Sequence, residues 1–553
     1  MVGRVLAGRG VGADGAAAFL DPRLKDLLPD PSHLLGLDAA VARLADAVED
    51  GEPVGLLGDY DVDGATSTAL LSRYLGALGV PVAVEIPDRL KDGYGPNPEA
   101  LDRLAAAGCR LVVTLDTGTT AFAPLAHAAA SGQEVVVVDH HAAEVELPPA
   151  LTVVNPNRLD QASPLKQLAA VGVAFVLLVG LNRELRRRGH FRVRTEPDLR
   201  QWLDLVALGT VGDVVPLVGL NRAFVRQGLK VAAGNGNAGL RALAEAAGIA
   251  GVSECWHLGF VLGPRINAGG RIGRSDLGAR LLTLDDVDEA RGVALKLDEL
   301  NQRRQAMERE QTALAELRLQ AQLDAGEPVL LAADARFHPG VIGILAARLV
   351  ERHHRPVCVV ALAEDGQGRG SARSVPGFDL GAAVILARRS GLLLQGGGHA
   401  MAAGLTVEGG RTEELRRFLR ARLEESAEPV ALGPRPLRID GALSVGGVTL
   451  ALARQLEQLA PYGSGNAEPV FCLSDPRVVE TRPVGEGHLA CTLGGAAGGR
   501  LKAIAFRSRE TALGRALLEG GPGLRLAGRL KLDRYQGREL ASFQIDDAAF
   551  SPR

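Results

Sequence analysis

The sequence predicts an α/β protein in which a parallel-sheet domain is joined by a long helix to a second α/β domain, followed by a C-terminal β-barrel. Short apolar runs alternate with Ala/Leu-rich periodic segments between about residues 50 and 215, which is typical of a parallel sheet covered on both faces. Residues 284–323 form one long charged pattern with helical spacing. Alternating strands turned by glycines follow residue 435.

The length of 553 residues exceeds what one hydrophobic core organises, so several units are expected. We place their boundaries where the pattern or the composition changes. The expected units are an N-terminal segment (1–49), a first domain (50–283), a connecting helix (284–323), a second α/β domain (324–424) and the β-barrel (435–553).

Five apolar runs are expected to form the sheet of the first domain. They span residues 54–57, 82–86, 111–115, 135–138 and 151–154. In open sheets of this kind, ligands bind beyond the carboxyl ends of the strands. The residues that directly follow these runs are strongly polar, so they are the first candidates for a functional site.

The later segments carry simpler signals. We interpret residues 284–323 as a solvated helix between two domains. Strands are expected at 329–332 and 357–361, and a Gly-rich loop at 396–398. An acidic, proline-containing linker at 424–436 precedes barrel strands such as 501–506 and 524–530.

Composition restricts the class of protein. The five cysteines show neither CxxC pairs nor zinc-ligand spacing, so no disulfide framework or thiolate metal site is expected. No stretch resembles a signal peptide or a membrane span, so a cytoplasmic protein without a membrane partner is expected. The net charge of −3 does not exclude nucleic acid, because a local basic groove would not appear in that total.

Three aspartates follow the first predicted strand. Asp59, Asp61 and Asp63 alternate along GDYDVDGATS, and in an extended chain their side chains would point the same way. Crowding three like charges is unfavourable unless cations neutralise them. The segment therefore favours a metal site, although DxDxDG alone is equally compatible with a calcium-like loop or a turn.

Further acidic and imidazole groups follow other predicted strands. Asp116 ends the third run, Asp139-His140-His141 ends the fourth, and Asp213 lies in GTVGDVVPL. Each alone has an ordinary interpretation as a helix cap or a loop residue. Together they converge on one edge of the sheet, and oxygen ligands with one or two imidazoles favour Mn²⁺ or Mg²⁺.

These segments carry a resemblance to a known family. DYDVDGATS, DTGTT, VVDHH and GTVGDVVPL resemble the four successive motifs of the DHH phosphoesterases. Other segments resemble the exonuclease branch of that family, its DHH-associated domain and its OB-fold: IPDRLKDGYGPN, GPRINAGGRIG, FHPGVIGILAARL, GRGSARS, GGGHAMAAGL and PYGSGNAEPVF. The resemblance covers nearly the whole chain. One departure is Leu57, where many relatives carry a histidine.

The resemblance implies a metal-dependent exonuclease that degrades single-stranded DNA from the 5′ end to 5′-mononucleotides, in recombination and repair. Two ions, Mn²⁺ or Mg²⁺, are implied. The first would be held by Asp63, Asp116, His140 and Asp213, and the second by Asp59, Asp61 and Asp116. His141 would face the scissile phosphate. The implied catalytic residues are Asp61, Asp63, Asp116, His140, His141 and Asp213.

The residues expected to contact DNA or phosphate are less sharply marked. Ser371 and Arg373 combine a hydroxyl with a fork-shaped cation, and Gly396–398 offer backbone amides beside His399. Aromatic residues of the barrel could stack on bases. The full set is Arg89, Arg265, Asn267, Arg271, Ser371, Arg373, Gly397, Gly398, His399, Tyr462 and Tyr535, with Phe506 as a further platform. Tight turns, surface ion pairs and core packing are the ordinary alternatives.

The sequence leaves two alternative functions open besides the exonuclease. One is a DHH phosphodiesterase for short oligonucleotides or cyclic dinucleotides, for which the barrel and the connecting helix are unnecessary. The other is a noncatalytic DNA-binding scaffold, which the full set of acidic motifs argues against. Single-stranded DNA is the expected partner, and a helicase and a single-strand-binding protein are candidates for delivering it.

Overall fold

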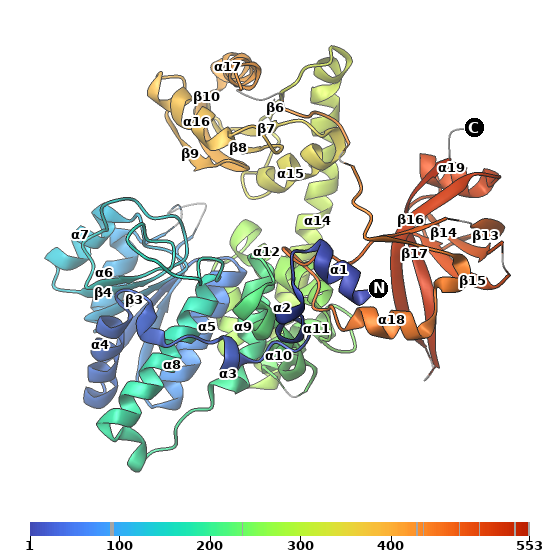
Figure 1. Ribbon diagram of the computed structural model, residues 1–553. Helices are drawn as coiled ribbons and strands as arrows, with labels where there is room; N and C mark the ends of the chain where they lie inside the picture. Colours follow the sequence, from blue (N-terminus) through green and yellow to red (C-terminus); the bar gives the residue numbers. More distant parts are fainter. Residues whose placement is uncertain are drawn as a thin grey trace.

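The structure is a computed structural model of the chain. It describes residues 1–88, 93, 95–234, 236–426, 430–434, 436–474, 476–496, 498–535 and 538–550. The described residues form three sheets, each with its own covering helices (Figure 1). The predicted order of an α/β domain, a long helix, a second α/β domain and a C-terminal β-domain is confirmed.

The first sheet has the strand order β2-β1-β3-β4-β5, with every pair parallel. Its strands are β1 (Val54–Gly58), β2 (Val82–Glu85), β3 (Leu111–Leu115), β4 (Glu134–Val138) and β5 (Thr152–Val154). All residues of β1 and β3 are buried, because helices cover both faces. One face packs on α4 (Leu37–Asp50), α5 (Val62–Ala77) and α8 (Ala170–Arg188), and the other on α6 (Pro98–Ala106) and α7 (Phe122–Ala130).

A layer of further helices extends the first domain beyond its sheet. They are α9 (Leu203–Gly212), α10 (Gly219–Ala233), α11 (Ala238–Ala246), the π-helix η4 (His257–Leu262), α12 (Gly263–Ile272) and α13 (Leu277–Thr283). Their apolar faces join the same hydrophobic core as α5 and α8. Short helices α3 (Leu24–Leu27), η1 (Pro31–His33), η2 (His190–Arg192) and η3 (Leu199–Trp202) lie along this domain.

The long connecting helix is α14 (Val287–Asp324), with Asp286 as its N-cap. It is less solvated than expected. Apolar residues such as Leu297 and Leu319 are buried, and so are Arg304 and Glu308, whose side chains form an ion pair of 2.6 Å. The helix therefore packs against both domains. Some of its charged residues are buried ion pairs, not solvated side chains.

The second domain holds a mixed sheet with the order β6-β7-β8-β10-β9. Its elements are β6 (Leu330–Asp334), α15 (Ile342–His353), β7 (Val357–Leu362), β8 (Gln367–Arg373), α16 (Leu380–Arg389), β9 (Gln395–His399), β10 (Ala402–Glu408), η5 (Gly409–Arg411) and α17 (Thr412–Glu424). The expectation of a loop at residues 396–398 is wrong, since these glycines lie in the edge strand β9. Glycine fits there because a Cβ on Gly398 would meet the backbone of Ala402 and Ala403.

The C-terminal domain contains a seven-stranded sheet with the order β11-β12-β16-β17-β15-β14-β13. Its elements are β11 (Gly441–Leu443), η6 (Val445–Gly447), α18 (Leu450–Glu457), β12 (Phe471–Leu473), β13 (Arg477–Val484), β14 (His488–Gly494), β15 (Arg500–Ala505), α19 (Ala512–Glu519), β16 (Leu524–Tyr535) and β17 (Arg538–Phe550). The N-terminal helices α1 (Val2–Gly8) and α2 (Ala13–Leu20) pack against this domain, and Val5 and Leu6 join its core. The N-terminal helix α1 therefore lies beside the C-terminal domain (Figure 1).

Within the part of the chain that the structure describes, no helix is both long and apolar enough to cross a lipid bilayer.

Candidate metal centre

The first aspartate cluster is a strand-to-helix junction, not an extended segment. Strand β1 ends at Gly58, and α5 begins at Val62 with Asp61 as its N-cap; the Asp61 carboxylate accepts the backbone N–H groups of Asp63 and Gly64 at 3.0 and 3.1 Å. The extended backbone that would point the three side chains the same way is therefore not present. The tight start of the helix brings the aspartates together instead, and Gly64 is required because a Cβ there would lie 2.3 Å from the Asp59 carbonyl oxygen.

Asp63 is fully buried at the amino end of a second helix. Its two carboxylate oxygens accept the backbone N–H groups of Ala170 (2.6 Å) and Val171 (2.9 Å), the first residues of α8. A helix amino end favours negative charge. Burial and the charges of Asp213 and Asp61 nevertheless raise the pKa of Asp63 well above its ordinary value. Without a cation, this carboxylate is poorly compensated.

Two further aspartates enter from other elements. Asp116 follows β3 with a left-handed φ of 62° and is buried. Asp213 follows the last turn of α9. Burial, with the charges of Asp61 and Asp63, raises the pKa of Asp116, and burial and Asp61 raise the pKa of Asp213 to about 7. The left-handed backbone of Asp116 is an uncommon conformation of the kind that clusters at functional sites.

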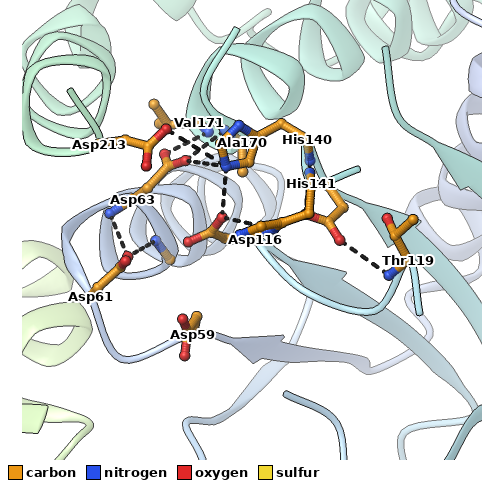
Figure 2. Close-up of polar contacts among 12 residues, drawn as sticks. Asp59, Asp61, Asp63, Asp116, Thr119, His140, His141, Ala170, Val171 and Asp213 are labelled. Carbon is orange, nitrogen blue, oxygen red and sulfur yellow. Dashed lines mark hydrogen bonds and ion pairs between the residues drawn. The ribbon is translucent and has the colours of Figure 1, made fainter. Parts of the chain in front are cut away.

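His140 lies between these carboxylates. Its Nε2 is 3.3 Å from Asp116 Oδ1, 3.6 Å from Asp213 Oδ2 and 3.8 Å from Asp63 Oδ2. Figure 2 shows the three carboxylates directed toward the imidazole ring. Burial, together with the charge of His141, lowers the pKa of His140 to about 4, so the ring is neutral and offers a lone pair.

Asp139 is a hydrogen-bond partner of the neighbouring His141. It accepts the backbone N–H groups of His140 and His141 at 2.8 and 3.2 Å, and its Oδ1 lies 2.7 Å from His141 Nδ1. Thr119 N–H donates to its other oxygen (3.1 Å; Figure 2). Burial opposes ionisation, but the hydrogen bonds outweigh it and hold the pKa of Asp139 below its usual range. The bond to Asp139 raises the pKa of His141 to about 9.

Asn155 and Asn157 support the histidine pair from the end of β5. The Asn155 amide donates to the His141 carbonyl oxygen (2.8 Å) and to Thr119 Oγ1 (2.9 Å), and the Asn157 amide donates to the His140 carbonyl oxygen (2.5 Å). Our sequence interpretation missed both residues. A sequence signal was present, because Asn155 directly follows the fifth strand, as candidate ligands follow the first, third and fourth strands.

The donor set fits a divalent cation. Ligand atoms lie within 4.8 Å of one another in three groups: Asp63, His140 and Asp213; Asp59, Asp61 and Asp116; and Asp116, His140 and His141. Buried Asp116 Oδ1, His140 Nε2 and Asp213 Oδ2 have no hydrogen-bond partner. Such orphaned atoms are costly unless a ligand satisfies them. Carboxylates with one or two imidazoles suit Mn²⁺ or Mg²⁺.

Three expected DNA contacts lie on α12, beside α14. Arg265 pairs with Asp298 of α14 at 2.8 Å, and Arg271 approaches the Gly340 carbonyl oxygen of the second domain at 3.5 Å. Asn267 Oδ1 is buried and has no hydrogen-bond partner. The two arginines thus have structural partners, whereas the Asn267 oxygen has acceptor capacity to spare.

The second domain supplies the expected phosphate contacts on two nearby strands. Ser371 and Arg373 share β8, where Arg373 Nη1 donates to Ser371 Oγ at 3.1 Å. Strand β9 carries Gly397, Gly398 and an exposed His399, and it pairs with β10, which in turn pairs with β8. These residues belong to one sheet, but the structure places them in a different domain from the aspartate cluster.

The aromatic candidates differ from one another. Tyr462 packs against the C-terminal core and its hydroxyl donates to the Leu456 carbonyl oxygen at 2.6 Å, so we assign it a packing role. Phe506 is 52% exposed, which leaves part of its ring accessible for stacking. Arg89 and the side chain of Tyr535 lie outside the described residues.

Comparison with known proteins gives consistent matches along the chain. The DHH family N-terminal domain matches residues 53–210, the DHHA1 domain residues 326–425 and the RecJ OB domain residues 439–547. The single-stranded-DNA-specific exonuclease RecJ of Salmonella typhimurium is 38% identical over 556 residues, covering 98% of this chain and 95% of that protein.

Solved structures agree with these matches. RecJ from Thermus thermophilus in complex with Mn²⁺ has a TM-score of 0.81 at 34% identity, covering 100% of this chain and 76% of that one. Its complex with Mg²⁺ has a TM-score of 0.76 at 32% identity, covering 100% and 74%. The fold and the carboxylate–histidine cluster therefore define a metal-dependent phosphoesterase of the DHH family. Within that family, the chain belongs to the RecJ single-stranded-DNA-specific exonucleases.

Proposed function

We propose that this protein removes 5′-mononucleotides from the 5′ end of single-stranded DNA by hydrolysis at two metal ions. The observation that carries the proposal is that buried ligand atoms of Asp116, His140 and Asp213 lie close together without a hydrogen-bond partner, beside the carboxylates of Asp59, Asp61 and Asp63. Crowded buried carboxylates are stable only beside cations. The RecJ relatives supply the substrate class and the two candidate metals.

Each ligand has a proposed place. Asp63, His140 and Asp213 hold one ion, Asp59 and Asp61 hold the other, and Asp116 lies between the two groups. Bound Mn²⁺ or Mg²⁺ supplies an activated water and neutralises charge on the phosphate. The amino end of α8 orients Asp63, and Asn155 and Asn157 fix the backbone of the histidine pair, so that the ligands are held before the ions bind.

His141 is proposed to act on the scissile phosphate. In the metal-free protein the hydrogen bond to Asp139 raises the pKa of His141 to about 9, so Asp139 favours the protonated form of the ring. Its Nδ1 is engaged by Asp139, which leaves Nε2 of this half-exposed side chain free to face solvent. As water oxygen bonds to phosphorus and the bond to the 3′-oxygen breaks, Nε2–H donates to a phosphate oxygen or passes its proton to the leaving 3′-oxygen.

The strand is proposed to run from the metal centre toward the other domains. Ser371, Arg373 and the β9 glycines with His399 would bind phosphates, Asn267 with Arg265 and Arg271 would border the path, and Phe506 would stack on a base. A helicase and a single-strand-binding protein would deliver the strand in recombination and repair. The described cysteines are all free thiols, which suits a reducing cytoplasm.

The test uses single-stranded DNA labelled at its 3′ end, incubated with Mn²⁺ or EDTA. Stepwise shortening from the 5′ end is expected with Mn²⁺ and not with EDTA. Asp116→Asn is expected to lower the rate about a thousandfold, because it removes a ligand between both groups. Asp102→Asn, an exposed aspartate paired with His127, should keep wild-type activity. Binding without cleavage by the wild type would favour a noncatalytic scaffold, and cleavage restricted to dinucleotides would favour a short-oligonucleotide phosphodiesterase.

A further inference from the structure

The loop that carries Asp213 is strained. Val214, the next residue, has a φ of 60°, and a β-branched side chain is a genuine outlier in this left-handed region. The side chain of Val214 is 68% exposed, so its own packing does not hold it there. A residue in this state persists only where the surrounding structure fixes the backbone.

Contacts on both sides of Val214 fix this backbone. On the amino side, Asp213 N–H donates to the Gly209 carbonyl oxygen of α9 at 2.9 Å. On the carboxyl side, the Asn221 amide donates to the Pro216 carbonyl oxygen at 3.1 Å. Leu217 N–H donates to the carbonyl oxygen of Ser464 in the C-terminal domain at 2.8 Å. The loop beside the metal centre is thus tied to a different domain.

Residues 459–466, which we name the clamp loop, approach this segment closely. A Cβ on Gly463 would lie 2.7 Å from Leu217 Cδ1, and a Cβ on Gly465 would lie 2.9 Å from Pro216 Cβ. Gly465 also has a φ of 68°. Gly465 is therefore required for the two loops to fit, whereas a Cβ on Gly463 would displace the side chain of Leu217, which is only 1% exposed.

Arg222 of α10 anchors the clamp loop from the catalytic side. It is 1% exposed, and its terminal nitrogens donate to the carbonyl oxygens of Leu459 (2.9 Å), Ala460 (2.7 Å) and Pro461 (3.2 Å). Its Nε donates to the Phe19 carbonyl oxygen at 2.8 Å, and the guanidinium lies over the Phe19 ring. One cation therefore joins the first domain, the N-terminal helices and the clamp loop.

We propose that the clamp loop, anchored by Arg222, is a positioning element of the metal centre. By holding Leu217 it keeps Val214 in its strained conformation, and thereby keeps the Asp213 carboxylate directed at Asp63 and His140. Arg222 itself touches no reacting atom and is a positioning residue. The inference rests on the proposed role of Asp213 as a metal ligand. In this proposal the C-terminal domain does more than contact DNA: its docking on the first domain raises the affinity of the metal centre for its ions.

The first test compares Mn²⁺ binding by the full chain, measured by electron paramagnetic resonance of the free ion. Arg222→Lys retains the charge, but its three donors sit on one nitrogen and cannot bond all four carbonyl oxygens that the planar guanidinium reaches. Its Mn²⁺ affinity is expected to fall about tenfold, with activity at saturating Mn²⁺ close to wild type. Arg226→Lys is the matched control, because Arg226 lies on the same helix and donates to the Leu20 carbonyl oxygen instead of the clamp loop.

The second test is a rescue. Glycine adopts a positive φ without penalty, so Val214→Gly removes the strain that the clamp opposes. Added to Arg222→Lys, it is expected to return the Mn²⁺ affinity to within about twofold of wild type. A merely structural role for Arg222 would lower the melting temperature without this rescue. Wild-type Mn²⁺ affinity in Arg222→Lys, or no recovery in the double variant, overturns the proposal.

Two further variants separate the possible failures. Gly465→Ala pushes the clamp loop from Pro216 by an independent route, and it too is expected to weaken Mn²⁺ binding; unchanged affinity counts against the clamp. Asp213→Asn tests the proposed ligand directly. Unchanged Mn²⁺ binding in Asp213→Asn would reject the ligand set of the proposed function, whereas weakened binding there with wild-type binding in Arg222→Lys would reject the clamp alone.

Discussion

At the scale of single residues, the carboxylates of the metal centre repel one another, and hydrogen bonds from neighbouring groups hold them in place. The amides of Ala170 and Val171 orient Asp63, and Asn155 orients the backbone behind His141. These bonds fix positions but do not neutralise the cluster, since burial still raises the pKa of Asp63 and Asp116. The site is therefore built for ligand geometry at a cost in stability that a cation removes.

The raised pKa values predict how metal changes stability with pH. In the metal-free protein, Asp213 has a pKa of about 7, against roughly 3.9 in an unfolded chain. The folded state then binds more protons, so its stability is fully present below the unfolded pKa and falls as the pH rises through the folded value. Mn²⁺ removes this penalty and displaces the protons. The gain in melting temperature on adding Mn²⁺ should be larger at about pH 8 than at about pH 5.5.

Differential scanning fluorimetry in EDTA and in Mn²⁺ measures this gain. Asp116→Asn should reduce it at both pH values, because one ligand is lost. An equal gain at both pH values in the wild type would show that the cluster is not protonated in the metal-free protein.

At the scale of elements, sequence patterns predicted most of the architecture. The five strands of the first sheet could be located because strands buried on both faces are continuously apolar. The direct turn from β1 into α5 was not predicted, since an aspartate such as Asp61 suits an extended ligand loop as well as a helix N-cap. The glycines of β9 were taken for a loop because their role, close approach to β10, depends on partners distant in sequence.

The connecting helix α14 gives a prediction at this scale. Glu308 is 5% exposed and pairs with Arg304 of the same helix and with Arg348 of α15. Glu308→Ala leaves Arg304 buried without its carboxylate partner, although Asn301 still accepts from it, and losing such a partner typically costs about 3–5 kcal/mol. Replacing both partners, as in Arg304→Met with Glu308→Leu, is expected to cost far less.

Urea unfolding followed by circular dichroism measures both changes. Glu299→Gln on the same helix is the control, because its pair with Lys296 is exposed and should contribute nothing measurable. Equal destabilisation by the single and the double variant would refute the role of an uncompensated buried charge.

At the scale of the whole molecule, the ligands come from residues 59–213 of one domain, whereas the proposed phosphate and base contacts come from the other two. The sequence could bring most of the candidate ligands together because they follow β1, β3 and β4, which are neighbours in one sheet, whereas Asp213 follows α9. It could not place α1 and α2 on the C-terminal domain, or Arg222 against the clamp loop, since these contacts join segments more than 200 residues apart. The N-terminal segment therefore helps to hold the first domain and the C-terminal domain together.

This assembly predicts that a change near the first residue destabilises the last domain. Leu6 is 3% exposed in the core of the C-terminal sheet. Leu6→Ala should cost about 2–5 kcal/mol there, through lost burial and a cavity. Hydrogen exchange read by mass spectrometry should therefore accelerate in β16 and β17 while β1 and β3, in a separate core, keep their protection. The control, Leu35→Ala, changes an exposed leucine and should leave both regions unchanged. Uniform acceleration in all sheets would mean that the chain unfolds as one cooperative unit, and no acceleration in β16 and β17 would mean that α1 does not stabilise this domain.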